Sequence, residues 1–210
     1  MACTLDGSYI QNADPLIMEK LQACKDFSDS QVDGMETLLL SGKTKYGNVS
    51  TWNRQTLKDL GVLPLYLTRN IWGVFKTSTK RRYLKTFMFT LRKTKTRKSK
   101  FKKLFQQIST HKIKRGAGCT VGNITHVTVS DNSFPFGYEQ TQFDLCLDIS
   151  VLKDNLNSIC EKVHDDDFQK VILKKLNQAF PAGVSDEEVQ VLVSVSRMAS
   201  LDDISKWKIT

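Results

Sequence analysis

Apolar residues recur along this chain at intervals of three and four positions, the spacing that places them on one face of a helix. The longest series starts at Leu145 and continues at offsets of 4, 7, 11, 14 and 18 with Ile149, Leu152, Leu156, Ile159 and Val163. A shorter series, with offsets of 0, 3, 4 and 7, comprises Leu84, Phe87, Met88 and Leu91. No convincing set of alternating strands accompanies them. The pattern predicts an all-α fold with one long amphipathic helix from Leu145 to Val163.

Turn residues divide the first half of the chain into short helices. Ser28 to Leu40 and Thr56 to Leu67 both have helical spacing. Three residues that disfavour helix interiors, Gly34, Gly61 and Pro64, are expected to interrupt them.

Cap signals mark the helices of the second half more sharply. The acidic run Asp165 to Asp167 precedes an apolar series, where a helix N-terminus favours negative charge. Pro181 and Gly183 are expected to end that helix. Ser185 with Glu188 three residues later indicates a capping box at the start of the next one.

The stretch from Lys112 to Thr141 is expected to be irregular. It holds several turn residues, namely Gly116, Gly118, Gly122, Pro135 and Gly137. Val127 and Val129 favour a short strand within it. The sequence therefore predicts one irregular loop region near 112–142.

Four segments of one continuous solenoid are predicted. They are N-terminal helices at 1–47, a Trp-containing helical repeat with an amphipathic helix at 48–91, a basic connector with a cysteine-bounded loop at 92–142, and C-terminal helical repeats at 143–210. An internal sequence similarity favours a repeat architecture. Val49 to Leu57 (VSTWNRQTL) and Ile204 to Thr210 (ISKWKIT) both place a Trp in similar surroundings. Chance similarity around a rare Trp is the alternative. Since the second copy stops where its helix is expected to begin, the repeat array is expected to continue beyond Thr210.

Positive charge is concentrated in one part of the chain. The 210 residues are 40% hydrophobic and 25% charged, which fits one globular domain or a segment of a larger solenoid. The formal net charge is +9, but sixteen Lys and Arg and no Asp or Glu lie between Lys76 and Arg115. The rest of the chain contains fifteen basic and twenty-two acidic residues, which gives it a formal net charge of −7. The charge therefore belongs to this basic strip and not to the whole protein.

The basic strip is a candidate for binding a polyanion, because clustered cations release counterions from such ligands. The candidate side chains are Lys80, Arg81, Arg82, Lys85, Arg92, Lys93, Lys95, Arg97, Lys98, Lys100, Lys102 and Lys103. The aromatic residues interleaved with them, Tyr83, Phe87, Phe89, Phe101 and Phe105, would suit stacking on RNA or DNA bases. Phe87, however, shares a helical face with Leu84 and Leu91, so part of this set is more simply core.

The default role of 92–103 (RKTKTRKSKFKK) is a solvated connector. If these charges bind, then sulfated glycosaminoglycan, acidic mucin or anionic lipid head groups suit an extracellular chain better than nucleic acid. The alternative is a soluble cytosolic helical protein that binds RNA or another acidic ligand through 76–115.

Catalytic and metal-binding patterns are weak. His111, His126 and His164 are far apart and show no zinc spacing. Cys160 and His164 form the one nucleophile-and-base pair on offer, without an orienting carboxylate at a recognisable spacing. The residues of Asp165 to Asp167 point in different directions on a helix, which favours capping over metal binding. Gly116 to Gly118 lacks the Gly-Lys-Thr of a phosphate loop. We expect no catalytic residue, metal or cofactor.

Signals for the cellular compartment conflict. Met1 to Leu16 has no apolar run of a secretory signal, and no stretch reaches eighteen apolar residues. Five cysteines and glycosylation sequons at Asn48 and Asn123 indicate secretion. This conflict suggests a fragment or truncated product. A bridge between Cys119 and Cys146 would stabilise the irregular loop, but free buried thiols are equally compatible with the sequence, and so are other pairings among Cys3, Cys24 and Cys160.

Three stretches of the chain resemble the mesothelin family. They are 50–63 (STWNRQTLKDLGVL), the cysteine-bounded loop 119–146, and 168–210 with its turn Phe-Pro-Ala-Gly and its ISKW segment. Within the family, the Lys-rich and Phe-rich character is most similar to the otoancorin branch.

The resemblance implies a right-handed superhelix of short armadillo- or HEAT-like helices in a secreted glycoprotein of the apical cell surface. It also implies a Cys119–Cys146 bridge, attachment of full-length relatives by a glycosylphosphatidylinositol anchor, and adhesion without catalysis. For the otoancorin branch, that adhesion attaches inner-ear epithelial cells to acellular gel matrix. The expected partner is extracellular matrix or a mucin-like, acidic glycan.

Overall fold

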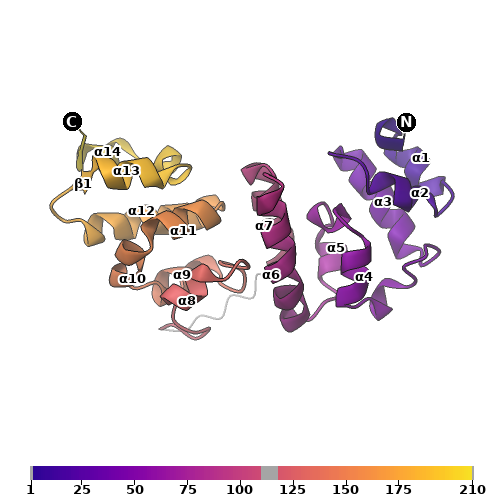
Figure 1. Cartoon of the computed structure of the whole chain (residues 1–210), viewed down its shortest axis with the longest axis horizontal. Coiled ribbons are helices and arrows are strands. Elements are labelled where there is room, and N and C mark those ends of the chain that lie inside the picture. Colours follow the sequence, from indigo (N-terminus) through magenta and orange to yellow (C-terminus); the bar gives the residue numbers. More distant parts are fainter. Residues whose placement is uncertain (1, 110–117, 210) are drawn as a thin grey trace. The chain divides into compact units, whose positions relative to one another are not determined.

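The computed structural model describes residues 2–109 and 118–209, which are predominantly helical (Figure 1). The all-α prediction is confirmed. In chain order the elements are η1 (Ala2–Thr4), α1 (Gly7–Asn12), α2 (Ile17–Leu21), α3 (Asp29–Leu40), η2 (Val49–Thr51), α4 (Arg54–Asp59), η3 (Leu63–Leu65), α5 (Arg69–Trp72), α6 (Thr77–Lys93), α7 (Lys98–Ile108), α8 (His126–Ser130), α9 (Gln140–Cys146), α10 (Ile149–Asp154), α11 (Leu156–Lys162), α12 (Asp166–Ala179), β1 (Val184–Ser185), α13 (Asp186–Leu192), η4 (Val195–Met198), α14 (Leu201–Ser205) and β2 (Trp207–Lys208).

The chain divides into two compact units, and the division passes through α6 and α7. Unit 1 comprises Met1–Phe87 and Lys103–Thr110, and unit 2 comprises Met88–Lys102 and His111–Thr210. The right-handed superhelix concerns an arrangement across both units, so it stays a prediction. The four predicted segments likewise stay a prediction.

In unit 1, α1 crosses α3 where two glycines meet. A Cβ on Gly34 would lie 2.2 Å from the carbonyl oxygen of Gly7, and a Cβ on Gly7 would lie 1.9 Å from that of Ser30. Only glycine therefore fits at either position. The sequence led us to expect that Gly34 interrupts this helix, but α3 continues through it. Gly34 instead permits the close crossing of α1 and α3. The helix begins as expected, with Ser28 and Gln31 forming a capping box.

Aromatic side chains dominate the rest of the unit 1 core. The Trp72 ring lies 6.0 Å from both Phe75 and Tyr83, and Tyr83 stacks on Phe87 at 4.9 Å between ring centroids. Tyr83 and Phe87 come from the apolar face of α6, and the whole predicted series from Leu84 to Leu91 is buried. This face is core, as its spacing predicted.

Unit 2 is built around α12, which packs against α9, α10 and η4 (Figure 1). Ile172 and Leu176 are fully buried there, and Phe143 of α9 stacks on Phe168 at 4.7 Å. The predicted helix boundaries hold, because Asp165 caps α12 and the helix ends before the Pro-Ala-Gly turn.

The C-terminal part of unit 2 is partly extended. Ser185 and Glu188 form the predicted capping box of α13. Trp207 lies in β2, which pairs in parallel with β1 through Val184. Gly183 precedes this pair with a φ of +106°, a conformation that L side chains rarely adopt.

The predicted long helix from Leu145 to Val163 is wrong in its continuity. The chain leaves helical geometry at Leu147 and again at Asn155, which has φ −128° and ψ 21°. Asn155 donates to the Val151 carbonyl at 2.9 Å and pairs with His126 at 2.5 Å, so its side chain bonds the backbone and a distant residue. Such competition disfavours Asn inside helices. The predicted apolar face holds only for its later part, since 152, 156, 159 and 163 are buried whereas Leu145 and Ile149 are 41% and 39% exposed.

The predicted irregular region near 112–142 is wrong for part of its length, while 112–117 lies outside the described residues. Thr125 caps α8, which contains Val127 and Val129 in a helix and not in the predicted strand. Val129 is buried, whereas Val127 is 78% exposed. Residues two positions apart share a face of a strand but lie on nearly opposite sides of a helix, so this difference in exposure fits the helix.

The predicted solvated connector at 92–103 is also too long. Lys98 begins α7, and this helix buries Phe101, Leu104 and Ile108. Only the turn 94–97 connects the helices α6 and α7.

Gly34→Ala is expected to destabilise the protein, because the added methyl group would collide with the α1 backbone. At a helix position without that contact, replacing Gly by Ala would stabilise the protein by about 1 kcal/mol. The close crossing therefore decides whether this substitution stabilises or destabilises the protein. We expect a loss of about 1–3 kcal/mol in the free energy of unfolding, measured by urea denaturation. Thr37→Ala, at an exposed position of the same helix, is the control and should change little. A more stable Gly34→Ala protein would contradict the crossing.

Candidate functional site

Three cations of the basic strip have structural roles. The first is Lys80, which is only 2% exposed and donates from Nζ to the carbonyl oxygen of Ile108 at 3.3 Å. Ile108 is the last residue of α7, so Lys80 bonds one of the carbonyls that a helix C-terminus leaves unpaired. Burial lowers the pKa of Lys80. Lys80 is therefore corrected from a surface polyanion-binding candidate to a buried cap.

Arg92 has a similar role in unit 2. Its Nη1 donates to the Asn132 carbonyl at 2.7 Å, and Lys162 donates to the carbonyls of Val129 and Asp131. The two side chains thus hold the carbonyls at the end of α8 and just after it. Burial lowers the pKa of both groups, and the charge of Arg92 lowers that of Lys162 further. The prediction that Arg92 is free to bind a polyanion is therefore corrected, because its half-buried side chain bonds the backbone of the fold.

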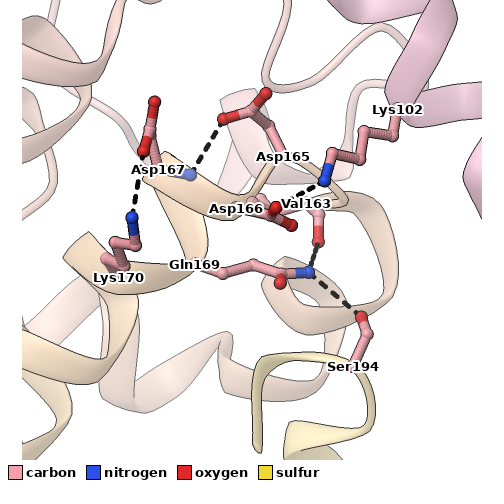
Figure 2. A network of polar contacts seen from close by, with 8 residues as sticks. All are labelled: Lys102, Val163, Asp165, Asp166, Asp167, Gln169, Lys170 and Ser194. Atoms are coloured by element: carbon pink, nitrogen blue, oxygen red, sulfur yellow. Dashed lines mark hydrogen bonds and ion pairs between the residues drawn. The ribbon is translucent and has the colours of Figure 1, made fainter. Parts of the chain in front are cut away.

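The third cation, Lys102, reaches the N-terminus of α12. Figure 2 shows its ammonium group paired with Asp166 in the first turn of that helix. In the same turn Asp165 accepts from the Asp167 backbone at 3.0 Å, and Asp167 pairs with Lys170. The acidic triplet therefore caps the helix, as its sequence suggested, and it also forms ion pairs.

A buried amide holds the base of this network. Gln169 donates from Nε2 to the Val163 carbonyl and to the Ser194 hydroxyl, both at 3.1 Å (Figure 2). It thereby joins the end of α11 to the segment before η4. The polar network fixes the region around Lys102 and leaves no open metal site within it.

Most of the other cations that the structure describes in the strip are exposed. Four of them, Lys93, Lys95, Arg97 and Lys98, lie in unit 2 at the turn between α6 and α7. We call these four residues the turn cluster. Next to it on α6, Phe89 is 55% exposed, while the other four interleaved aromatic residues are buried. The turn cluster with Phe89 is the candidate binding surface.

Other predicted cations lie outside the turn cluster. Arg81, Arg82 and Lys85 are exposed on α6 in unit 1, and Lys100 is half-buried at the start of α7. Lys103 is exposed and lies 3.7 Å from Asp29.

The electrostatics of the turn cluster favour an anion. Lys98 is the first residue of α7, whose first turn contains no acidic residue. The N-terminus of a helix carries partial positive charge, so cations there repel it and a bound anion relieves the repulsion.

Cys160 and His164 do not form a nucleophile and base. Cys160 is fully buried, and burial raises its pKa to about 12, so the reactive thiolate is essentially absent at neutral pH. His164 is 8% exposed beside Phe101, and burial lowers its pKa to about 4, with Lys98 and Arg92 adding to the effect.

Across 2–109 and 118–209, no three His, Cys, Asp or Glu residues converge as metal ligands would. His126 lies within this part and pairs with Asn155, whereas His111, Gly116 and Ala117 are outside it. No helix formed by these residues has both the length and the apolar character of a membrane span.

Two disulfides cross-link the chain. Cys119 and Cys146 are bridged with their Cα atoms 4.9 Å apart, as the family resemblance implied. Cys3 and Cys24 form a second bridge with Cα atoms 5.4 Å apart. The sequence left this pair open because five cysteines allow many pairings. Cys160 is a free thiol.

Both sequon asparagines are exposed, but their surroundings differ. Asn48 Oδ1 accepts from the backbone N–H and the hydroxyl of Ser50 at 2.9 and 2.8 Å. Asn123 lies inside the loop closed by the Cys119–Cys146 bridge. Use of either sequon stays a prediction.

Comparison with known proteins decides the family. The Mesothelin family model matches residues 1–210, the whole chain. The chain belongs to the mesothelin family. It is 27% identical to the mesothelin-like protein of Mus musculus, 26% identical to that of Homo sapiens and 23% identical to mesothelin of Mus musculus. Each alignment covers 100% of the chain but only 32%, 30% and 32% of the respective relative. The chain thus spans about a third of their length, and no solved structure matches it.

Membership of the mesothelin family agrees with the resemblance drawn from the sequence. The finer likeness to the otoancorin branch stays a prediction, because the relatives compared are mesothelin and mesothelin-like proteins.

The cysteine pairing is directly testable. Mass spectrometry of the oxidised chain should find Cys3–Cys24 and Cys119–Cys146, with one thiol left on Cys160. Because that thiol is buried and its pKa is raised to about 12, alkylation near pH 8 should be slow in the folded chain and at least about 100-fold faster in urea. Rapid labelling of the folded chain would contradict this burial.

Acidification should destabilise unit 2 through His164. Its pKa is lowered from 6.5 to about 4, so between these values the unfolded chain binds a proton that the folded chain excludes. The contribution to stability is fully present above pH 6.5 and is lost as the pH falls towards 4. It amounts to at most about 3 kcal/mol. In urea denaturation, His164→Gln should therefore lose less stability on acidification than the natural chain.

A matched control uses Cys160→Ala, which removes a buried side chain that does not titrate in this range. Its loss of stability should be similar at every pH from about 4 to 7. Parallel pH profiles for His164→Gln and the natural chain would show that His164 is not the titrating group.

Proposed function

We propose that this chain is an extracellular, non-enzymatic adhesion module of mesothelin type that binds acidic glycans through the turn cluster. The observation that carries the proposal is the exposed cationic turn between α6 and α7 in a chain with two disulfides. Disulfides persist mainly in oxidising compartments outside the cytosol. There, the abundant polyanions are sulfated and carboxylated glycans.

Phe89 supports a sugar ligand beside the cations. It is exposed one helical turn before Lys93, so an apolar ring and an ammonium group lie on neighbouring positions of α6. A sugar ring could pack its C–H face on Phe89 while its sulfate or carboxylate pairs with Lys93. Stacking on nucleic acid is less well supported, because the other four aromatic residues of the strip are buried.

Family membership adds finer elements to the proposal. We propose that the full-length protein is a glycoprotein of the apical cell surface, attached by a glycosylphosphatidylinositol anchor and arranged as a right-handed superhelix. If the otoancorin likeness holds, its adhesion joins inner-ear epithelial cells to acellular gel matrix. A matrix or mucin-like acidic glycan is then the partner of the turn cluster.

The test measures affinity for a size-defined heparin oligosaccharide by calorimetry. Reversing two charges with Lys93→Glu and Arg97→Glu should weaken binding at least about tenfold, because each cation near an anionic surface contributes about 1 kcal/mol. Affinity of the natural chain should also fall as salt is raised, since counterions are released on binding.

The matched control is Lys43→Glu with Lys58→Glu, two exposed lysines of unit 1 that give the same change in net charge. It should bind nearly as well as the natural chain. Equal losses in both double variants would mean that net charge, and not the turn cluster, controls binding. Tighter binding to single-stranded RNA than to the oligosaccharide would favour the cytosolic polyanion-binding alternative.

A further inference from the structure

The two sequons are held in the fold by contacts of different range. The hydrogen bonds around Asn48 are local, because Ser50 and Thr51 bond Asn48 itself and Trp52 donates to the Gly47 carbonyl at 3.2 Å. Val49 and Trp52 are nevertheless buried, and the Trp52 ring lies 6.5 Å from that of Phe75. Unlike Asn123, Asn48 lies outside both loops that the disulfides close.

Around Asn123 the bonds reach across the loop. The residue before it, Gly122, accepts from the Tyr138 hydroxyl at 3.1 Å, and the residue after it, Ile124, donates to the Cys146 carbonyl at 2.8 Å. Ile124 is 1% exposed, so its side chain is anchored in the unit 2 core. Asn123 is exposed, but the backbone on both sides of it is fixed.

Gln142 of α9 holds the start of the same loop. Its Oε1 accepts from the backbone N–H of Thr120 at 2.8 Å and from the Thr120 hydroxyl at 3.1 Å. Its Nε2 donates to the Gly118 carbonyl at 3.2 Å. With the Cys119–Cys146 bridge between them, these bonds dock 118–124 along α9.

The hydroxyl groups of the two sequons are also placed differently. Ser50 directs its hydroxyl at Asn48 Oδ1. Thr125 is the cap of α8, and its hydroxyl oxygen accepts from the Thr128 backbone and pairs with the Thr128 hydroxyl. Presenting Asn123 with its hydroxyl partner to an enzyme therefore requires α8 to lose its cap.

We propose that Asn123 accepts a glycan only before the Cys119–Cys146 bridge closes, whereas Asn48 accepts one before or after the chain has folded. Occupancy of Asn123 is then set by competition between glycosylation and oxidation of the two thiols. This inference rests on the proposed extracellular function, because both reactions belong to the secretory pathway.

The two competing reactions are chemically complete with co-reactants of that pathway. In glycosylation, Asn123 Nδ2 bonds to the anomeric carbon of an oligosaccharide carried on a lipid diphosphate. The carbon–oxygen bond to the diphosphate breaks, the amide loses a proton, and the lipid diphosphate leaves. In closure, the Cys119 and Cys146 thiols become one disulfide, and their two electrons and two protons reduce the disulfide of an oxidoreductase to two thiols.

The experiment uses the unglycosylated, oxidised chain with purified oligosaccharyltransferase and a lipid-linked oligosaccharide. Initial rates at Asn48 and Asn123 are read by mass spectrometry of the glycopeptides. In the oxidised natural chain, Asn48 should be modified while Asn123 reacts at least tenfold more slowly than in Cys119→Ser/Cys146→Ser. The rate at Asn48 should be equal in both chains.

Two further variants test whether loss of the Cys119–Cys146 bridge itself, and not a general loosening of the fold, makes Asn123 reactive. Cys3→Ser/Cys24→Ser removes the other disulfide and should leave Asn123 slow. Cys119→Ala/Cys146→Val fills the space of the bridge with apolar groups, and it replaces the serine pair if circular dichroism shows that pair to be unfolded at the assay temperature. Its Asn123 should also be a good acceptor.

Either of two results would overturn the inference. One is modification of Asn123 in the oxidised natural chain at a rate within twofold of the folded bridge-less chain. The other is an Asn123 that stays unmodified in the folded chain without the bridge. Because the assay uses purified components and no acidic glycan ligand, its result is independent of the binding test of the proposed function.

Discussion

The constraint on which this structure depends is that a stretch with sixteen cations and no acid must still bury one face of two helices. The apolar face of α6 and that of α7 enter the cores, and the charges have to lie beside or opposite these faces. Lys80 and Arg92, at the margins of the buried face of α6, bond backbone carbonyls at or near the ends of α7 and α8. Carbonyls at helix ends carry partial negative charge, so they substitute for the missing carboxylates. The turn cluster is among the described cations of the strip that remain exposed.

Local signals in the sequence predicted the elements that local physics determines. The capping box at Ser185 and the buried series from Leu84 to Leu91 were predicted correctly, because each depends on residues within one or two turns of a helix. The break at Asn155 could not be read in the same way. Its side chain bonds His126, which is 29 residues away, and no periodicity reports such a contact.

The candidate site was predictable only in part for the same reason. Composition located the basic strip, but the fold decides which of its cations are structural, since Lys102 meets Asp166 across 64 positions of sequence. Cys119–Cys146 was expected because of the family resemblance, while Cys3–Cys24 had no local signal. Gln142 was missed altogether, although a buried glutamine with three polar contacts organises the loop that holds Asn123.

The turn cluster works against the helix that carries it. Cations in the first turn of α7 oppose the helix dipole by a few tenths of a kcal/mol each, and they also repel one another. Burial of Phe101 and Leu104 and the pairing of Lys102 with Asp166 offset this cost. The helix is therefore stabilised by its inner face, and its outer end carries a cluster of exposed cations. An anion bound at that end would remove an existing repulsion without requiring the fold to change.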